Sequence, residues 1–532
     1  MILMMKKHLL TALALLTAAT TFAQEALQKA PAIIPAPRKI TVTSGSLALP
    51  AHVLFTTPAN DLAPQLVYIN DMLGGSAAYP VELSLTGNPQ DAAGYKLHID
   101  RTGIKITGND KDGLFNGLVT LLQLCKTNTA ANGSITLPCL DLDDVPSTRW
   151  RGFMLDEARH FFGKAAVKQL LDWMAFYKLN RFHWHLSDAQ GWRIAIQQYP
   201  KLTSIGGTGN FTDSTAAARF YTQDDIREIV AYAKTRNIEI IPEIDMPGHA
   251  SAATRAYPEL SGGNAPGGYD GFTFNPAAEY TYQFLGNVTR ELLQLFPFHT
   301  IHIGGDEVAL GIKAWENNAA VQQMMQQQGF HELKEVEAYF LKRIADTVIA
   351  QGGSVFAWDE AASGNLPSTD AGIMWWRQNI TQSLMDAQER YNVVYCPRLP
   401  FYFDFIQDST HVSGRTWGKE KLYNRYSDVY NFPADPAFAN LVPRHPFGMQ
   451  ANLWTETVIT GKRLQFLVFP RLAAFSEAAW TEAFRKNLDA FNLRLQQHLP
   501  LYDQAGIYYY DPFDPHKHAE PVDVPVKPQV ND

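Results

Sequence analysis

The residues of this chain best suited to chemistry lie at 302–307, which read His-Ile-Gly-Gly-Asp-Glu. The apolar run at 300–303 predicts a buried strand, and the two glycines end it. Asp306 and Glu307 follow at once. Because neighbouring carboxylates interact strongly, we expect their pKa values to differ, so that one can donate a proton while the other stays ionised. Cleavage of a glycosidic bond needs such a pair, although the same two residues also suit the first turn of a helix.

Eight short apolar runs predict the element that positions this pair. We expect strands at 152–155, 181–185, 239–244, 300–303, 354–357, 372–374, 392–395 and 448–453. Between the first two, residues 164–178 predict an amphipathic helix, because Val167, Leu170 and Met174 share one face. Eight strand–helix repeats predict an α/β fold, a (β/α)8 barrel of the TIM type, with its longest insertion at 404–444.

Reactive side chains follow nearly every predicted strand. In chain order they are Asp156, Arg159 and His160; His183, His185 and Asp188; Glu243, Asp245 and His249; Asp306 and Glu307; Trp358, Asp359 and Glu360; Trp375 and Trp376; Tyr402 and Asp404; and Trp454 and Glu456. Active sites of such barrels lie at the carboxyl ends of the strands, so these residues predict one shared pocket. The mixture suits a sugar, because carboxylates bind hydroxyl groups and indole rings cover the apolar faces.

A metal site is the main chemical alternative. On a strand, His183 and His185 would place both imidazoles on one face, and His249, Asp245 and Asp306 could complete a set of ligands. The other interpretation makes these histidines hydrogen-bonded groups in the core or behind the pocket. We favour the second interpretation, because the surrounding residues form a longer pattern that needs no metal, and we expect no metal or other cofactor.

Composition narrows the possible partners. The chain has 532 residues, of which 46% are hydrophobic and 18% charged, with a net charge of -8. No basic stripe is present, so we expect no nucleic-acid partner, and nothing indicates an oligomeric state. The three cysteines are too few for a disulfide framework; a Cys125–Cys139 bridge is possible in an oxidising compartment, but buried free thiols are favoured.

Residues 1–23 resemble a secretory signal peptide. Lys6 and Lys7 precede an apolar run at 9–19, and Ala23 offers a small residue for cleavage. The run is too short to span a bilayer, so we expect no membrane span. We therefore expect export to the periplasm or the cell exterior, with a mature chain that starts near Gln24.

The remaining sequence predicts three parts. Residues 24–146 predict a small α+β accessory domain, with strands at 95–99 and 104–107, a helix at 113–125 and no catalytic constellation. Residues 147–507 hold the barrel. The tail at 508–532 is rich in Pro and Asp, and we expect it to be loosely ordered.

Five stretches, in this order, resemble the family-twenty glycoside hydrolases, the β-N-acetylhexosaminidases. They are RGFMLDEARHF at 151–161, HWHLSDAQGWR at 183–193, PEIDMPGH at 242–249, HIGGDE at 302–307 and WTE at 454–456. The resemblance covers nearly the whole mature chain. That family also has a small α+β domain before its barrel, which matches the division expected here.

The resemblance implies a role for each matching residue. Glu307 resembles the general acid/base, Asp306 the carboxylate that holds the 2-acetamido group of the substrate, and Tyr402 the phenol that bonds the acetamide oxygen. The other substrate-binding positions implied are Arg151, Asp188, His249, Trp358, Trp375 or Trp376, Asp404, Trp454 and Glu456, with Asp245 and His185 as supporting groups behind them. The Trp375-Trp376 doublet leaves open which ring faces the sugar, and Trp417 and Tyr430 are both candidates for an aromatic lid.

Adjacent residues such as Asp306 and Glu307 cannot easily sit on opposite faces of a sugar, as an ordinary retaining pair must. The resemblance implies instead that the acetamide of the substrate is the nucleophile. The expected activity is the exo-acting, retaining removal of terminal β-linked N-acetylglucosamine from glycans, with N-acetylgalactosamine as a further candidate sugar. Two alternatives are a relative that releases disaccharides, of the lacto-N-biosidase type, and a non-catalytic glycan-binding protein.

Overall fold

The computed structural model describes residues 31–418, 421–433 and 438–523, so the predicted signal peptide lies outside the described residues. The chain forms two compact units. One contains the described residues up to Asp144 together with Arg485–Ile507. The other contains Val145–Phe484 and the described residues from Tyr508 onward. Each unit is described by itself.

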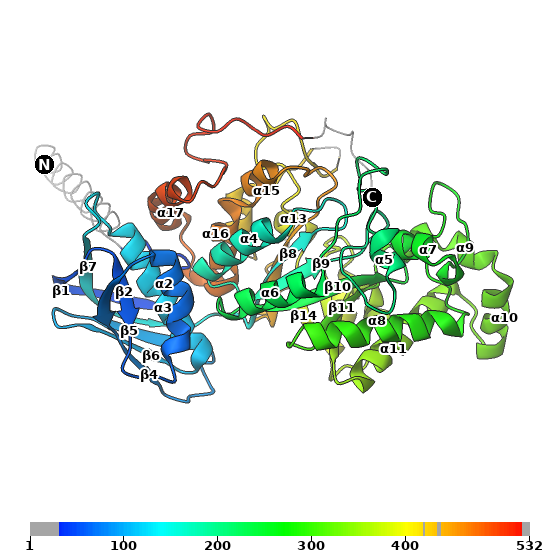
Figure 1. Ribbon diagram of the computed structural model, residues 1–532, viewed down its shortest axis with the longest axis horizontal. Helices are drawn as coiled ribbons and strands as arrows, with labels where there is room; N and C mark the ends of the chain where they lie inside the picture. Colours follow the sequence, from blue (N-terminus) through cyan, green and yellow to red (C-terminus); the bar gives the residue numbers. More distant parts are fainter. Residues whose placement is uncertain (1–30, 419–420, 434–437, 524–532) are drawn as a thin grey trace, which may run out of the picture. The chain divides into compact units, whose positions relative to one another are not determined.

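The smaller unit is built on a five-stranded sheet with the order β1-β7-β5-β6-β4. Its strands are β1 (Lys39–Leu49), β4 (Glu82–Leu85), β5 (Tyr95–Ile99), β6 (Ile104–Gly108) and β7 (Ile135–Asp144), while β2 (Val53–Thr56) pairs with β3 (Ala77–Pro80). The helix α3 (Lys111–Thr127) packs on β5 and β6 (Figure 1). The strands and the helix predicted in this region are confirmed.

The helix α17 (Leu488–Gln504) belongs to this smaller unit, whereas we expected residues up to 507 to belong to the barrel. Its side chains bond the segment that leads into β1: Arg494 Nη1 donates to the carbonyl of Ile33 at 2.7 Å, and His498 Nε2 lies 2.8 Å from that of Ala32. These partners are more than 450 residues apart in sequence, so no local pattern predicts the pairing.

The larger unit is a closed barrel of eight parallel strands in the order β8-β9-β10-β11-β12-β13-β14-β15, with β15 pairing β8. The strands are β8 (Trp150–Asp156), β9 (Arg181–His185), β10 (Glu239–Met246), β11 (Thr300–Gly304), β12 (Ser354–Trp358), β13 (Ala371–Trp375), β14 (Asn392–Tyr395) and β15 (Gly448–Leu453). All eight predicted strands are confirmed, and the (β/α)8 fold with them.

Helices surround the strands and bury their outer faces, so that every residue of β8 and of β15 is buried. The longer helices are α4 (Lys164–Phe176), α6 (Gln223–Lys234), α8 (Glu279–Leu295), α10 (Ala319–Gln328), α11 (Leu333–Ala350), α12 (Thr381–Arg390), α15 (Gly461–Val468) and α16 (Arg471–Trp480). Within this unit α4 packs beside α6, and α8 beside α11 (Figure 1).

The short helices mostly follow strands or connect longer elements. They are η1 (Ala63–Leu66), α2 (Val67–Leu73), α5 (Lys201–Ser204), α7 (Ser251–Ala256), η2 (Pro258–Leu260), η3 (Val308–Leu310), α9 (Lys313–Glu316), η4 (Asp359–Ser363), α13 (Arg398–Phe401), α14 (Tyr426–Asn431) and η5 (Ala483–Arg485). Among the described residues, no helix has the length and apolar character needed to cross a membrane. Cys125, Cys139 and Cys396 are all buried free thiols.

The described part of the C-terminal tail is fixed to the barrel unit, so the expectation of loose order does not hold for residues 508–523. Glu520 accepts hydrogen bonds from the backbone nitrogens of Val412 (2.7 Å) and Ser413 (3.0 Å). Asp523 accepts one from the backbone nitrogen of Ile459 at 2.8 Å. The acidic residues of the tail are thus hydrogen-bond acceptors for loops of the barrel.

Candidate active site

The carboxyl ends of the strands meet in one cavity, as the sequence predicts. Its lining combines acids, arginines and aromatic rings: Arg159, Asp306, Glu307, Trp358, Trp376, Arg398, Tyr402, Arg415, Trp454 and Glu456. The residues come from both halves of the barrel sequence, so only the closed fold brings them together.

The acid pair owes its position to the glycines that end β11. Gly304 has a φ of +67°, and a Cβ there would lie 1.7 Å from Oδ1 of Asp245, so only glycine lets the strand pass so close to that carboxylate. Glu307 also adopts a left-handed conformation, with a φ of 50°, which is uncommon for a side chain of its kind. The turn leaves the Asp306 side chain 10% exposed and that of Glu307 33% exposed, so Glu307 is the more accessible of the two.

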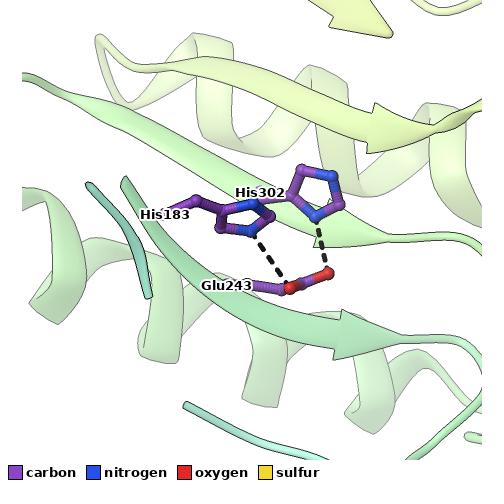
Figure 2. A group of neighbouring side chains, drawn as sticks. All are labelled: His183, Glu243 and His302. Atoms are coloured by element: carbon purple, nitrogen blue, oxygen red, sulfur yellow. Dashed lines mark ion pairs between the residues drawn. The ribbon is translucent and has the colours of Figure 1, made fainter. Parts of the chain in front are cut away.

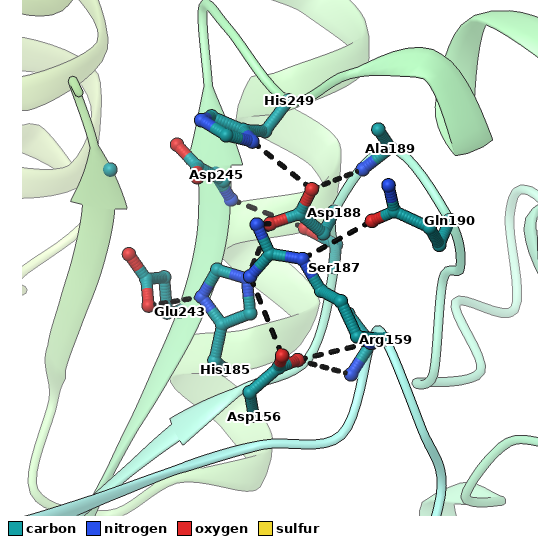
Figure 3. A network of polar contacts seen from close by, with 12 residues as sticks. Asp156, Arg159, His185, Ser187, Asp188, Ala189, Gln190, Glu243, Asp245 and His249 are labelled. Carbon is teal, nitrogen blue, oxygen red and sulfur yellow. Dashed lines mark hydrogen bonds and ion pairs between the residues drawn. The ribbon is translucent and has the colours of Figure 1, made fainter. Parts of the chain in front are cut away.

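His249 connects the acid pair to a buried network, and Figure 3 shows its contact with Asp188 in that network. Its Nε2 lies 3.4 Å from Oε2 of Glu307 and 3.7 Å from Oδ2 of Asp306, and its Nδ1 lies 3.0 Å from Oδ1 of Asp188. The other oxygen of Asp188 lies 2.7 Å from Nη2 of Arg159 and 2.9 Å from Nε2 of His185. His249 therefore supports the pair from behind, although it does not line the cavity, and the same holds for Asp188 and His185.

Below this network lies another carboxylate, Glu243, which the sequence places among the reactive side chains of the third strand but to which it assigns no role. Figure 2 shows it between His183 and His302, whose ring nitrogens lie 3.0 and 2.7 Å from its two oxygens. Glu243 also contacts Nδ1 of His185 and accepts a hydrogen bond from Nε1 of Trp358 at 2.9 Å. It thereby fixes a tryptophan of the cavity wall and the histidine that holds Asp188.

The pKa values of the acid pair are pushed apart, as expected, but in the order opposite to the one that the implied roles need. Burial raises the pKa of Asp306 to about 6, with Glu307 adding to the rise and His249 opposing it. Burial also acts on Glu307, but the contact with His249 and the charge of Arg159 outweigh it and lower its pKa below the ordinary value. Burial opposes a charge on His249, but Asp188, Asp245 and Asp306 outweigh it and raise the pKa of His249 well above its ordinary value.

Asp245 lies behind the turn that carries Asp306. It is fully buried, and neither of its oxygens has a hydrogen-bond partner among the described residues. Burial and the charge of Asp306 raise the pKa of Asp245 well above its ordinary value, despite the nearby His249. A neutral Asp245 would remove one negative charge from beside Asp306.

The tryptophan doublet is divided between the cavity and the core. Trp376 lines the cavity, stacks against Tyr402 with an interplanar angle of 18°, and donates its Nε1 to Glu360 at 3.0 Å. Trp375 is fully buried and packs edge-on against Tyr395 and Phe438. Successive side chains at the end of a strand point to opposite sides, so only one ring can face the cavity. The prediction that Trp375 binds substrate is thereby corrected.

Arg151 does not reach the cavity, and its predicted role in binding a sugar is corrected as well. It lies near the start of β8, where its guanidinium donates to the carbonyls of Lys178 and Thr148, both at 2.8 Å. Arg159, eight residues later and beyond the carboxyl end of the strand, lines the cavity instead, 4.9 Å from the ring centroid of Trp454. Both arginines belong to the same sequence motif. Their positions relative to the predicted strand could have distinguished them, because only Arg159 follows the carboxyl end of the strand.

The remaining predicted residues lie as follows. Tyr402, Trp358, Trp454 and Glu456 line the cavity. Asp404 is buried beside it, with Oδ2 3.4 Å from Nε of Arg415. Trp417 and Tyr430 do not line the cavity: Trp417 covers the guanidinium of Arg398 at 4.0 Å, and the hydroxyl of Tyr430 donates to Glu477 at 3.1 Å. The sequence analysis missed Arg398 and Arg415, because Arg398 begins the short helix α13 and Arg415 lies in the insertion that follows, and neither segment has a strand pattern.

Four groups of side chains have the spacing of metal ligands: His183, Glu243 and His302; His185, Glu243 and Asp245; Asp188, Asp245 and His249; and His249, Asp306 and Glu307. Glu243 belongs to the first two groups, and its oxygens already accept a hydrogen bond from the indole of Trp358 and contact three imidazoles. Donors directed at both oxygens are the pattern of a buried hydrogen-bond network rather than of a cation site.

A closed (β/α)8 barrel with an acid pair, aromatic walls and arginines at its mouth has the features of a glycosidase. The chain belongs to glycosyl hydrolase family 20: residues 149–483 match the catalytic domain of that family and residues 30–145 match its domain 2. The family makes this chain a glycosidase, and the resemblance read from the sequence is confirmed.

Named relatives and solved structures also support the assignment to this family. The chain is 32% identical to the beta-hexosaminidase of Porphyromonas gingivalis over 90% of its own length and 64% of that protein, so it spans less than two thirds of that relative. It is 33% identical to the beta-hexosaminidase of Vibrio furnissii over 84% of this chain and 76% of that one. A crystal structure of the family 20 exo beta-N-acetylglucosaminidase from Vibrio harveyi in complex with N-acetylglucosamine matches with a TM-score of 0.80 and 32% identity, over 91% of this chain and 79% of that one.

Proposed function

We propose that this protein is an exo-acting β-N-acetylhexosaminidase that removes terminal β-linked N-acetylglucosamine, and also N-acetylgalactosamine, from glycans. The observation that carries the proposal is that Asp306 and Glu307 are adjacent on one wall of the cavity, beside Trp358, Trp376 and Tyr402. The similarity to two beta-hexosaminidases and to an exo beta-N-acetylglucosaminidase supports the same substrate.

In the proposed reaction Glu307 donates its proton to the oxygen of the leaving group. The acetamide oxygen of the sugar attacks the anomeric carbon, and the bond to the leaving group breaks. The product of this step is a cyclic oxazolinium, which Asp306 stabilises by accepting the acetamide N–H, while the hydroxyl of Tyr402 donates to the attacking oxygen and orients it. Water, deprotonated by Glu307, then opens the ring from the face that the leaving group has vacated. Two displacements at one carbon retain the β configuration.

The proposed roles need a proton on Glu307 and a negative charge on Asp306. Without a bound sugar, however, the pKa of Asp306 is raised and that of Glu307 is lowered, so the proton favours Asp306. A bound sugar would favour the exchange, because its acetamide N–H would donate to Asp306 and its glycosidic oxygen would accept from Glu307. His249 lies beside both carboxylates and gives the shared proton a short path between them. The pair therefore acts as one titrating unit.

The cavity favours release of a single sugar over release of a disaccharide. Arg415, from the 404–444 insertion, and Arg398 are part of its lining, and Arg415 bonds Glu456. Side chains that occupy this end of the cavity leave less room for a second sugar beyond the first. A purely glycan-binding function is not favoured either, because a binding site has no use for a shared proton between two carboxylates.

A chromogenic assay tests the proposal. Purified enzyme should release nitrophenol from the β-N-acetylglucosaminide and the β-N-acetylgalactosaminide, and should be nearly inert toward the plain β-glucoside, which has no acetamide. The Glu307→Ala variant is the control for contaminating activity. Release from a lacto-N-bioside but not from either monosaccharide substrate would contradict the exo-acting proposal.

We also propose that the protein is exported, to the periplasm or the cell exterior, on account of the charged and apolar pattern within residues 1–23. Amino-terminal sequencing of protein from its native host should give a first residue at or near Gln24. A soluble cytoplasmic protein that retains Met1 would contradict the proposal.

A further inference from the structure

Arg415 lines the cavity but has no part in the proposed reaction. Its Nη2 donates to Oε1 of Glu456 at 2.7 Å, and its Nε lies 3.4 Å from Oδ2 of Asp404. The side chain is 32% exposed, whereas that of Asp404 is 1% exposed. Arg415 is therefore the accessible member of a group of three charges, and it presents part of its guanidinium to the cavity.

This group lies across the mouth of the barrel from the acid. Glu307 follows β11 and Glu456 follows β15, and these strands are four places apart in the closed ring of eight. A pyranose ring has C4 opposite its anomeric carbon. When the anomeric carbon faces Glu307, C4 and its hydroxyl thus face the wall formed by Arg415, Glu456 and Asp404.

The same wall contains carboxylate oxygens that can accept hydrogen bonds from a ligand. Among the described residues, Oε2 of Glu456 and both oxygens of Asp404 receive no hydrogen bond. Burial raises the pKa of Asp404 to about 7, with Arg415 opposing the rise. Burial acts on Glu456 too, but Arg415 and Arg159 outweigh it and lower its pKa. Arg415 thus helps to keep both groups in the charged form, in which they accept hydrogen bonds from a hydroxyl.

The backbone around Arg415 is held in place. Its N–H donates to the carbonyl of Asp404 at 3.2 Å, and its carbonyl accepts from the nitrogen of Ile406 at 3.0 Å. The preceding residue, Gly414, has a φ of +120°, and a Cβ there would lie 2.9 Å from a side-chain carbon of Ile406. Ser413, two residues before Arg415, donates its N–H to Glu520 of the C-terminal tail at 3.0 Å. A residue fixed in this way can act as a rigid part of a binding wall.

We propose that Arg415 is a specificity-determining residue, which sets the configuration that the site accepts at C4 of the sugar. It does so by orienting Glu456 and Asp404 as acceptors for the C4 hydroxyl and by donating to the oxygen of that hydroxyl. The proposal deepens the proposed function and rests on it, because it assumes that the anomeric carbon of the bound sugar faces Glu307. The chemical class of ligand is a neutral N-acetylhexosamine whose C4 hydroxyl is free.

The test compares the full-length protein with Arg415→Gln. The readout is the ratio of kcat/KM for the nitrophenyl β-N-acetylglucosaminide to that for the β-N-acetylgalactosaminide, which differ only at C4. Because both rates come from one preparation, partial misfolding cancels in the ratio. We expect the ratio to move at least tenfold toward one, the effect of losing a charge-assisted hydrogen bond. For a 4-deoxy substrate, which has no C4 hydroxyl, the substitution Arg415→Gln should lower kcat/KM far less than it does for either parent compound.

Arg425→Gln is the matched control, because that guanidinium lies in the same insertion but bonds Tyr423 and does not line the cavity. Its ratio should equal that of the unmodified enzyme. Glu520→Gln keeps Arg415 but loosens its anchor, and its ratio should shift in the same direction by a smaller amount. An unchanged ratio in Arg415→Gln, or an equal shift in Arg425→Gln, would overturn the proposal.

Calorimetric titration with free N-acetylglucosamine and N-acetylgalactosamine separates this proposal from the proposed function. A change in the ratio of the two Kd values in Arg415→Gln would support the role of Arg415 even if the protein hydrolysed neither substrate. Hydrolysis by the unmodified enzyme, combined with unchanged ratios in the variant, would sustain the proposed function and refute the role of Arg415. Failure to bind either sugar would refute both.

Discussion

The Nε2 atom of His249 lies 3.4 Å from Oε2 of Glu307, while its Nδ1 contacts Asp188. A charged imidazole in this position lowers the pKa of both members of the acid pair. It also links them to Arg159 and His185, which hold the other oxygen of Asp188. The protonation of the proposed acid is thus set by a chain of contacts that reaches well into the barrel.

The pH dependence of activity should change when His249 is replaced. Asp306 must be ionised to hold the acetamide, and its pKa is raised to about 6, so kcat/KM of the unmodified enzyme should fall as the pH drops through about 6. Without the imidazolium the pKa of Asp306 rises further, so His249→Gln should move this acidic limb to higher pH. A profile of kcat/KM between pH 4 and 9 measures the shift, and a limb that stays in place or moves to lower pH would refute the link.

Tyr402→Phe should lower turnover by about 10²- to 10³-fold, the cost of removing one preorganised donor to the transition state. The tyrosine lines the cavity and stacks against Trp376, so the phenylalanine ring should keep its packing. Tyr430→Phe is the control, because its hydroxyl bonds Glu477 in the core and does not line the cavity. Steady-state kinetics of both variants would decide, and near-normal turnover of Tyr402→Phe would show that another group bonds the acetamide.

Activity should survive exhaustive chelation. The proposed proton donor and nucleophile are both organic groups, and the buried histidines with the spacing of metal ligands contact Glu243 instead. The measurement is turnover before and after dialysis against a chelator, with metal content checked by mass spectrometry. If turnover vanished and zinc restored it, the alternative interpretation of His183 and His185 would be correct.

Stability should decline with rising pH because of a buried acid in the barrel unit. Glu157 is fully buried and accepts a hydrogen bond from Tyr221 at 2.9 Å, and burial raises its pKa from 4.5 to about 8. The neutral acid therefore stabilises the fold fully below pH 4.5, and this contribution is lost as the pH rises toward 8. One such proton changes the free energy of unfolding by up to about 1.4 kcal/mol per pH unit in that window.

In Glu157→Gln, thermal melts between pH 5 and 8 should show a flatter decline of Tm than in the unmodified protein. Glu228→Gln is a suitable control, because Lys168 and Lys164 lower the pKa of that exposed carboxyl and it titrates below the window. Parallel pH slopes in the unmodified protein and Glu157→Gln would show that Glu157 is already charged in the folded state.

The barrel was predictable because its signals are local. Each strand is a short apolar run that ends in polar or aromatic residues, and the pattern repeats eight times, as the observed strands show. The acid pair was predictable for the same reason: Gly304, Gly305, Asp306 and Glu307 are consecutive. Their approach to Asp245, which only glycine permits, was not visible in the sequence.

The wrong and missing predictions of site residues have one physical cause. The local sequence does not determine the direction in which a side chain points or which distant residues it contacts. Arg151 and Arg159 belong to one motif, but only the second lies beyond the end of its strand. Trp375 and Trp376 are neighbours, yet the pleat turns one ring into the core. Arg415 reaches the cavity from an irregular insertion in which Ser413 bonds Glu520, 107 residues further along the chain.

The two carboxylates of the acid pair should fail in different ways when each loses its charge. Glu307→Gln removes the proton donor, so it should slow substrates with poor leaving groups severely and activated aryl substrates much less, since the latter need little protonation. Asp306→Asn weakens the step that forms the oxazolinium, which both classes of substrate share, so it should slow both alike. Linear free-energy plots of kcat against leaving-group pKa would show a steep slope for Glu307→Gln and a slope close to that of the unmodified enzyme for Asp306→Asn.

The stereochemistry of the product completes this test. If the acetamide is the nucleophile, proton NMR should show the β anomer first, with the α anomer appearing only by later mutarotation. An ordinary inverting pair would need its two carboxyl groups on opposite faces of the sugar, which the adjacency of Asp306 and Glu307 makes difficult. A first-formed α anomer, or equal slopes for the two variants, would therefore rule out substrate assistance by this pair.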